Sequence, residues 1–186
     1  MPVSGRGSLP FALVHGESLV AAASFALERA GVQLVDFNVA WDGLRSELVD
    51  EGRPLVLHDP LCPLTPPEFL AEAVRACLET GEVVVGCRPV TDTLKQVERG
   101  PEGELVGATV DRDDYLTVCS PVVLPAAVVA TLEQAPDSAD FASLVAALRG
   151  GSAVRLLEAP PLARRVSGEA DLAVLEALSV SLGQAG

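Results

Sequence analysis

The sequence predicts an α/β fold, in which a sheet of apolar strands carries helices on both of its faces. The chain has 186 residues, of which 49% are hydrophobic and 21% charged, enough for one domain with a sizeable core. Short apolar runs such as residues 82–87 have the length of buried strands. Segments with helix signals alternate with these runs, which is the pattern of an α/β sheet.

The expected elements follow one another without a convincing linker, so residues 1–186 are treated as a single domain. Ser18 can cap a helix over 19–30 that Gly31 ends. The remaining expected elements are a loop at 1–10, a short apolar run at 11–14, strands at 32–37, 54–59, 82–87, 115–118 and 153–157, and helices at 41–49, 66–78, 125–132, 140–148 and 170–182.

Residues 88–121 interrupt this alternation with a long excursion between two strands. The runs 89–95 and 105–110 are extended in pattern, and the Gly- and Pro-containing stretch 98–104 lies between them. Two strand-like runs around such a turn predict a β-hairpin. We expect this hairpin to project and to dock on another molecule.

The charge balance excludes some classes of function. The chain carries 26 acidic and 13 basic residues, a net charge of −13, which argues against nucleic-acid binding. No apolar run reaches the roughly 18 residues that a membrane span needs, and residues 1–10 lack a signal pattern, so we expect a cytoplasmic protein. Four cysteines without C-x-x-C spacing are expected to be reduced and buried. Lys95 is the single lysine, so a mechanism that needs two lysines is excluded.

Short blocks along most of the chain carry a resemblance to a known family. They lie at residues 9–12 (LPFA), 16–19 (GESL), 58–64 (HDPLCPL), 89–95 (PVTDTLK), 109–112 (TVDR), 118–121 (VCSP), 140–144 (DFASL) and 163–172 (ARRVSGEADL). In this order they resemble the 2-C-methyl-D-erythritol 4-phosphate cytidylyltransferases, nucleotidyltransferases of the isoprenoid pathway. The blocks within 88–121 are the most specific.

The resemblance implies a three-layer αβα, Rossmann-like nucleotidyltransferase sheet with a projecting hairpin arm. It also implies a reaction in which the phosphate of methylerythritol phosphate attacks the α-phosphorus of CTP and pyrophosphate leaves. Cationic side chains and Mg²⁺ do most of the work in such a reaction. In the family the arm wraps a second subunit, so the resemblance implies a homodimer through residues 88–121.

The nucleotide side of the family pattern is eroded in this chain. The family's first strand is expected to be absent, and its Gly-rich triphosphate loop is reduced to Gly5, Arg6 and Gly7, for which the alternative is an ordinary loop. Phe11 stands at the position of the catalytic lysine. The cytosine-binding segment has no counterpart between the strands at 32–37 and 54–59, so a strand–helix unit is expected to be lost.

The opposite side of the pattern keeps more of its candidate residues. Arg165 stands at the family's second lysine, while Cys62 replaces the arginine of the His-Asp block. Asp59 follows a strand, where α/β sheets bind ligands, so Asp59 and Arg165 are the candidate catalytic residues. Asp59 is also a candidate metal ligand, and its alternative is a turn or cap aspartate. Arg165 with Arg164 is either a phosphate clamp or a solvated pair.

Three further residues are candidates for substrate binding. Thr93 and Ser120 carry hydroxyl groups that either bind a substrate or serve as ordinary strand side chains. Arg112 matches the arm arginine that completes the partner's site in the family, and its alternative is a surface pair with neighbouring aspartates. Gly5, Arg6 and Gly7 are the weakest candidates, for a nucleotide.

These departures leave three hypotheses open. The first is a cytidylyltransferase-like protein with weak or no activity. The second is an active nucleotidyltransferase in which Arg6 and Arg165 replace the lysines, with Mg²⁺ as cofactor and CTP and a polyol phosphate as ligands. The third is a regulatory subunit that forms a heterodimer with a complete paralogue through its arm.

Overall fold

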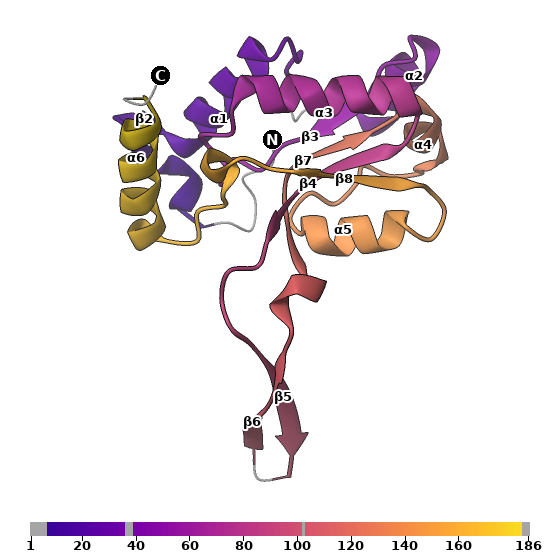
Figure 1. The fold of residues 1–186 in the computed structure, drawn as a ribbon. Helices are drawn as coiled ribbons and strands as arrows, with labels where there is room; N and C mark the ends of the chain where they lie inside the picture. Colours follow the sequence, from indigo (N-terminus) through magenta and orange to yellow (C-terminus); the bar gives the residue numbers. More distant parts are fainter. Residues whose placement is uncertain (1–6, 36–38, 102, 184–186) are drawn as a thin grey trace.

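A mixed four-stranded sheet lies at the centre of the computed structural model, which describes residues 7–35, 39–101 and 103–183 (Figure 1). The strand order is β3-β7-β4-β8, and the bounds are β3 Leu55–Leu57, β4 Val83–Pro89, β7 Leu116–Leu124 and β8 Val154–Glu158. Strand β7 is antiparallel to β3 and β4, whereas β8 is parallel to β4. The predicted α/β class is confirmed.

Helices cover both faces of this sheet because its central strands are apolar on both sides. Val122 and Leu124 of β7 point to one face, and Val123 points to the other. The first face packs against α2 (Trp41–Asp50), α4 (Ala126–Thr131) and α5 (Phe141–Leu148). The second face packs against α3 (Pro67–Thr80), and α1 (Leu19–Arg29) lies against α3. The result is the predicted three-layer arrangement.

A second apolar cluster joins the start of the described chain to its end. It contains Val14 and Leu19 from the first part, Leu61 after β3, and Leu172 and Leu175 of α6 (Glu169–Gly183). The short elements around it are η1 (Leu9–Phe11), β1 (Leu13–Val14), β2 (Glu17–Ser18) and η3 (Pro161–Ala163). Within the described ranges, no helix is both long and apolar enough to cross a bilayer.

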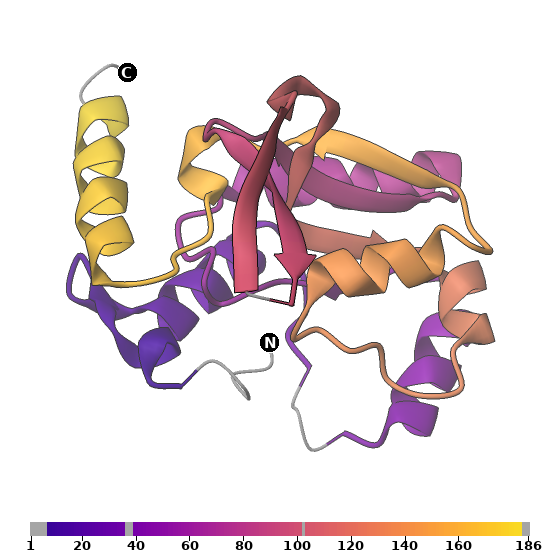
Figure 2. The same cartoon turned by 90° about the horizontal axis from the view of Figure 1, so that it is seen from below.

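A two-stranded arm of β5 (Leu94–Gly100) and β6 (Gly103–Val110) projects from the sheet (Figure 1). In the view from below, the arm points toward the viewer and overlaps the sheet (Figure 2). The hairpin was predicted, but its turn is shorter than expected, because Glu98, Arg99 and Glu104 of the expected turn 98–104 belong to the paired strands. The short helix η2 (Arg112–Asp114) leads from the arm back to β7.

The helices lie within a few residues of their predicted positions. Ser18 caps α1 by accepting a hydrogen bond from the Ala21 N–H at 3.3 Å, and Gly31 follows the helix with φ of 76°. The predicted strand at 32–37 is wrong over its described part, since residues 32–35 belong to no strand. The Val32 N–H donates to the Leu27 carbonyl at the end of α1 instead of to a ladder. Residues 36 and 37 lie outside the described residues.

Replacing Gly86 with alanine should destabilise the fold. A Cβ at Gly86 of β4 would lie 2.8 Å from the carbonyl oxygen of Ser120 and 3.4 Å from Phe69 Cε1. Such overpacking against backbone costs about 1–3 kcal/mol. Urea unfolding of Gly86→Ala should therefore show a lower free energy of unfolding.

Gly43→Ala is the matched control, because a Cβ at Gly43 in α2 meets nothing within 4 Å. Alanine favours a helix over glycine by about 0.5–1 kcal/mol, so this variant should be more stable. Equal stabilities of the two variants would contradict the packing described for β4.

Candidate functional site

The turn that follows β3 holds a carboxylate in a nearly buried position. Asp59 is 5% exposed, and its Oδ1 accepts a hydrogen bond from the Leu61 N–H at 3.0 Å. The Cys62 N–H donates to the Asp59 carbonyl at 2.9 Å, which closes the turn. A buried charge of this kind requires partners. Asp59 is thus both the predicted turn residue and a candidate binding group.

Arg165 supplies the positive charge beside this carboxylate. Its Nε donates to Asp59 Oδ2 at 2.9 Å, although 106 residues separate the two in sequence. The Val166 N–H donates to the Leu61 carbonyl at 2.7 Å, and this bond fixes the segment after η3 against the turn. The Arg165 side chain is 41% exposed, so one of its faces remains available to solvent or to a ligand.

A buried hydroxyl couples the end of β3 to β7. Ser120 Oγ accepts from the Asp59 N–H at 2.9 Å and is also hydrogen-bonded to His58 Nδ1. Ser120 and His58 are both fully buried, at 0% and 1% exposed. Ser120 Oγ therefore links the His58 ring of the turn after β3 to the backbone of Asp59.

Burial also changes the protonation behaviour of His58. Burial lowers the pKa of His58 from 6.5 to about 4, and the Asp59 carboxylate acts in the opposite direction. Its Nε2 is buried without a hydrogen-bond partner among the described residues. A proton added to the ring would therefore place a charge where little solvates it.

A cavity of about 300 Å³ opens beside these groups. It lies at the small end of the range for ligand sites, which is about 300–1,000 Å³. Asp140 lines it as the cap of α5, accepting from the Ala142 N–H at 3.0 Å and from the Ser143 hydroxyl at 2.7 Å. The Ser143 hydroxyl holds the pKa of Asp140 below its usual value. The polar and sulfur-bearing lining residues are Asp59, Cys62, Cys119, Ser120, Asp140 and Arg165.

The two thiols of the cavity are structural rather than reactive. Burial raises the pKa of Cys62 far above its usual value, and burial also raises the pKa of Cys119 to about 11. Both are therefore protonated thiols at neutral pH, and the thiolate is the nucleophilic form. The cavity offers hydrogen bonding and charge, not covalent chemistry at sulfur.

The structure brings together some of the predicted site residues and leaves others apart. Asp59, Ser120 and Arg165 line the cavity. Thr93 is exposed in the segment before β5, and Arg112 is exposed in η2, where its Nη1 donates to the Thr91 carbonyl at 2.6 Å. Both belong to the base of the arm. Gly7 is exposed and does not line the cavity, and Gly5 and Arg6 lie outside the described residues.

Sequence reasoning undervalued two residues of the site. His58 was noted only as the first residue of the block 58–64, and its buried bond to Ser120 joins positions 62 residues apart. Asp140 was noted only as part of a block, although an aspartate directly before a helix is a signal for a cap. Its presence in the cavity follows from where α5 packs, which spacing does not reveal.

The donor set at Asp59 does not fit a resident magnesium ion. Both carboxylate oxygens are engaged, Oδ1 by the Leu61 N–H and Oδ2 by Arg165. A hard cation at Oδ2 would lie beside the positive charge of the Arg165 guanidinium group, which opposes its binding. Among the residues that the structure describes, no group of three or more acidic, His or Cys side chains is placed to hold a metal.

Comparison with known proteins agrees with the resemblance of the sequence blocks. A family model for 2-C-methyl-D-erythritol 4-phosphate cytidylyltransferase matches residues 41–180. The chain belongs to this family. Its cytidylyltransferase relative from Corynebacterium diphtheriae is 32% identical over 178 residues, covering 92% of this chain and 64% of that protein. The relative from Saccharopolyspora erythraea is 32% identical over 136 residues, covering 70% of this chain and 57% of that protein.

The chain therefore spans less than two thirds of the length of these curated relatives. A crystal structure of the cytidylyltransferase from Thermus thermophilus superimposes with a TM-score of 0.63 at 23% identity, covering 93% of this chain and 94% of that one. This likeness confirms the predicted nucleotidyltransferase-type fold.

Acid should destabilise the protein through His58. Because the pKa of His58 is about 4 when folded and 6.5 when unfolded, the unfolded state binds the proton more readily between these values. The contribution of neutral His58 is complete above pH 6.5 and is lost as the pH falls toward 4, by about 3 kcal/mol. Urea unfolding across this range should show the loss in wild type and not in His58→Asn, whose amide keeps a hydrogen-bonding group for Ser120 without a titratable proton.

His15→Asn is the matched control, because His15 is exposed and has φ of 51°, which asparagine tolerates. This variant should follow the wild-type pH dependence. Parallel curves for wild type and His58→Asn would show that His58 is not the group that titrates.

Proposed function

We propose that this chain is a cytidylyltransferase-like protein with weak or no cytidylyl transfer activity. It would keep a small polar cavity that binds part of a phosphorylated polyol, and an arm for assembly. Family membership supports the general class, and the departures at Phe11 and Cys62 support the loss of activity.

The shortage of positive charge in the cavity is the observation that carries this proposal. Arg165 is the one cationic side chain among the described residues that line it, and its Nε already lies 2.9 Å from Asp59 Oδ2. Together with Asp59 and Asp140 the lining has an excess of negative charge. Phosphoryl and nucleotidyl transfer depend on several cations that neutralise the charge developing on phosphate oxygens.

The expected loss of rate can be judged from the effect of removing one electrostatic donor. Removing one such donor costs about 3 kcal/mol, or roughly a hundredfold in rate. Lys95, the single lysine of the chain, does not line this cavity, since it is in the arm and donates to Thr109. Losing two donors would cost up to about 6 kcal/mol, or roughly ten-thousandfold in rate, with the reservation that such effects are not additive.

The deciding experiment measures CTP-dependent pyrophosphate release from 2-C-methyl-D-erythritol 4-phosphate. The cytidylyltransferase from Corynebacterium diphtheriae serves as the positive control under identical conditions. We expect a rate below about a hundredth of the control, with or without Mg²⁺. A rate comparable to the control would refute the proposal in favour of an active enzyme that uses Arg6 and Arg165.

Arg165 should be the residue that makes the cavity attractive to a phosphate group. We expect millimolar 2-C-methyl-D-erythritol 4-phosphate to raise the melting temperature of wild type slightly, because a ligand of the folded state stabilises it by mass action. Arg165→Ala should abolish the shift. Arg164→Ala is the control, since Arg164 pairs with Asp171 at 3.7 Å instead of Asp59. Equal shifts in both variants would place the ligand elsewhere.

The arm supports a second proposal, that the protein assembles as a homodimer through residues 88–121. Val97, Leu105 and Val106 are 57%, 68% and 79% exposed on a hairpin that projects from the sheet. Apolar side chains on a projecting element are a usual mark of an interface. Arg112 at its base would then lie close to a partner. A heterodimer with a complete paralogue would use the same surface.

Val106→Asp should convert the dimer into a monomer, because it places a charge at the centre of the apolar arm surface. Sedimentation velocity measures the change at micromolar concentration. Leu13→Asp is the control, since Leu13 is similarly exposed at 61% but lies outside the arm. Monomeric wild type, or a dimer that tolerates Val106→Asp, would contradict assembly through the arm.

A further inference from the structure

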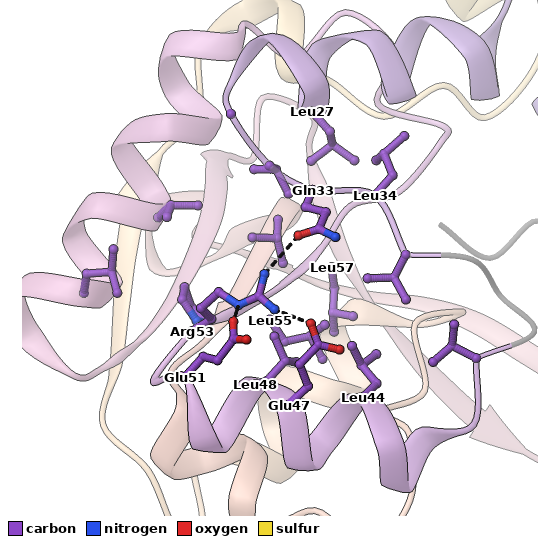
Figure 3. A pocket seen from close by; sticks show the side chains of 18 of the residues that line it. Leu27, Gln33, Leu34, Leu44, Glu47, Leu48, Glu51, Arg53, Leu55 and Leu57 are labelled. Carbon is purple, nitrogen blue, oxygen red and sulfur yellow. Dashed lines mark hydrogen bonds and ion pairs between the residues drawn. The ribbon is translucent and has the colours of Figure 1, made fainter.

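A second and larger cavity lies along β3, on the far side from β7. It has a volume of about 910 Å³ and is a groove formed by α1, α2, α3, β3 and residues 31–35 (Figure 3). Most of the labelled side chains around it are leucines (Figure 3). The groove is separate from the cavity at Asp59, since the two share no lining residue.

The backbone of β3 forms part of the groove. In the part of the chain that the structure describes, β3 is hydrogen-bonded to β7 alone and so ends the sheet. All of its residues, Leu55–Leu57, line the groove. An edge strand presents a row of unpaired N–H and C=O groups, which is a template for another strand.

The groove also exposes apolar side chains to solvent. Leu34 and Val35 are 40% and 42% exposed there, and Leu78 of α3 is 60% exposed. These side chains are not covered by any described element. A segment lying in the groove beside β3 would bury these apolar groups.

The polar end of the groove has an excess of acid. Arg53 donates from Nη1 to Gln33 Oε1 at 3.0 Å and lies between Glu47 and Glu51, with its Nε 2.6 Å from Glu51 Oε2 (Figure 3). One guanidinium thus faces two carboxylates. With a chain charge of −13, this end of the groove favours a basic rather than an acidic binding partner.

We propose that this groove binds an extended segment of a partner protein, which adds to the sheet as a strand beside β3. Three requirements define the segment. Its backbone must be extended, to pair with β3. Its side chains must be apolar where they face the groove walls, and a basic residue must lie beside Glu47 and Glu51. This is recognition by strand addition, with backbone pairing for affinity and pockets for specificity.

The charge of the groove also argues against the arm of a second copy as the segment that binds there. The arm strands carry Lys95 and Arg99 against Glu98 and Glu104, so they offer no net positive charge. The proposal does not depend on the proposed transferase-like function, because none of its residues belongs to the cavity at Asp59.

The test uses a fluorescein-labelled peptide, Lys-Arg-Val-Thr-Val-Thr-Val-Lys, and a twin whose alternate backbone nitrogens are methylated. Fluorescence anisotropy measures binding to the full chain, and hydrogen exchange measures the amides of β3. We expect the first peptide to bind and to slow exchange at Val56 or Leu57. The twin should bind at least about tenfold more weakly, because it lacks backbone donors.

Two protein variants with the same change in charge locate the site. Val35→Lys places an ammonium group in the groove wall and should weaken peptide binding about tenfold or more. Val180→Lys is the control, since Val180 is 51% exposed on α6, outside the groove, and it should bind as wild type does.

The other outcomes overturn the proposal. Equal binding of the two peptides, or of the two variants, excludes strand addition at β3. Absence of peptide binding at millimolar concentration also excludes strand addition at β3. If wild type is a dimer and Val35→Lys alone dissociates it, the groove binds a second copy of the chain instead of a partner protein. Pyrophosphate release from CTP is measured in a separate assay, so failure of the proposed function and failure of the groove proposal can be told apart.

Discussion

A nearly buried carboxylate is the constraint around which the candidate site is built. Asp59 is 5% exposed, and a charge in that position is stable only when donors surround it. The Leu61 N–H and Arg165 supply those donors. Satisfying them fixes three parts of the chain together: the end of β3, the start of the turn after it and the segment that follows η3. Ser120 adds β7 to this group through the Asp59 N–H.

The same arrangement limits the chemistry of the cavity. Arg165 is paired with Asp59, so a phosphate group must bind the same guanidinium group or displace it from Asp59. The Arg165 side chain is 41% exposed, so its other nitrogens can be reached by a ligand while the pair with Asp59 is kept. The lining as a whole holds two carboxylates and one guanidinium. An anionic ligand therefore gains little net attraction, whereas a hydroxyl group can bond to any of the three. This balance fits a weak polyol phosphate site better than a site for a triphosphate.

The sequence predicted what depends on local pattern and left undetermined what depends on packing. The helices, the central apolar strands and the arm follow from caps, periodicity and turn residues. The strand at 32–37 failed because alternation of Val32, Gln33, Leu34 and Val35 does not reveal whether a neighbouring strand is present. For the site, sequence blocks selected Asp59, Ser120 and Arg165, which the cavity brings together. They also selected Thr93 and Arg112, which lie at the base of the arm, because the sequence blocks cover the arm as well as the cavity.

Strand β3 takes part in both the cavity and the groove, yet the two can be separated physically. With three residues and one described neighbour strand, β3 makes few ladder bonds of its own. Its last turn is nevertheless fixed from the β7 side, by Ser120 bonding to His58 and to the Asp59 N–H. These bonds are buried and lie away from the free edge. A strand that adds to that edge can therefore stabilise β3 without moving Asp59, and the position of the carboxylate does not require the groove to be filled.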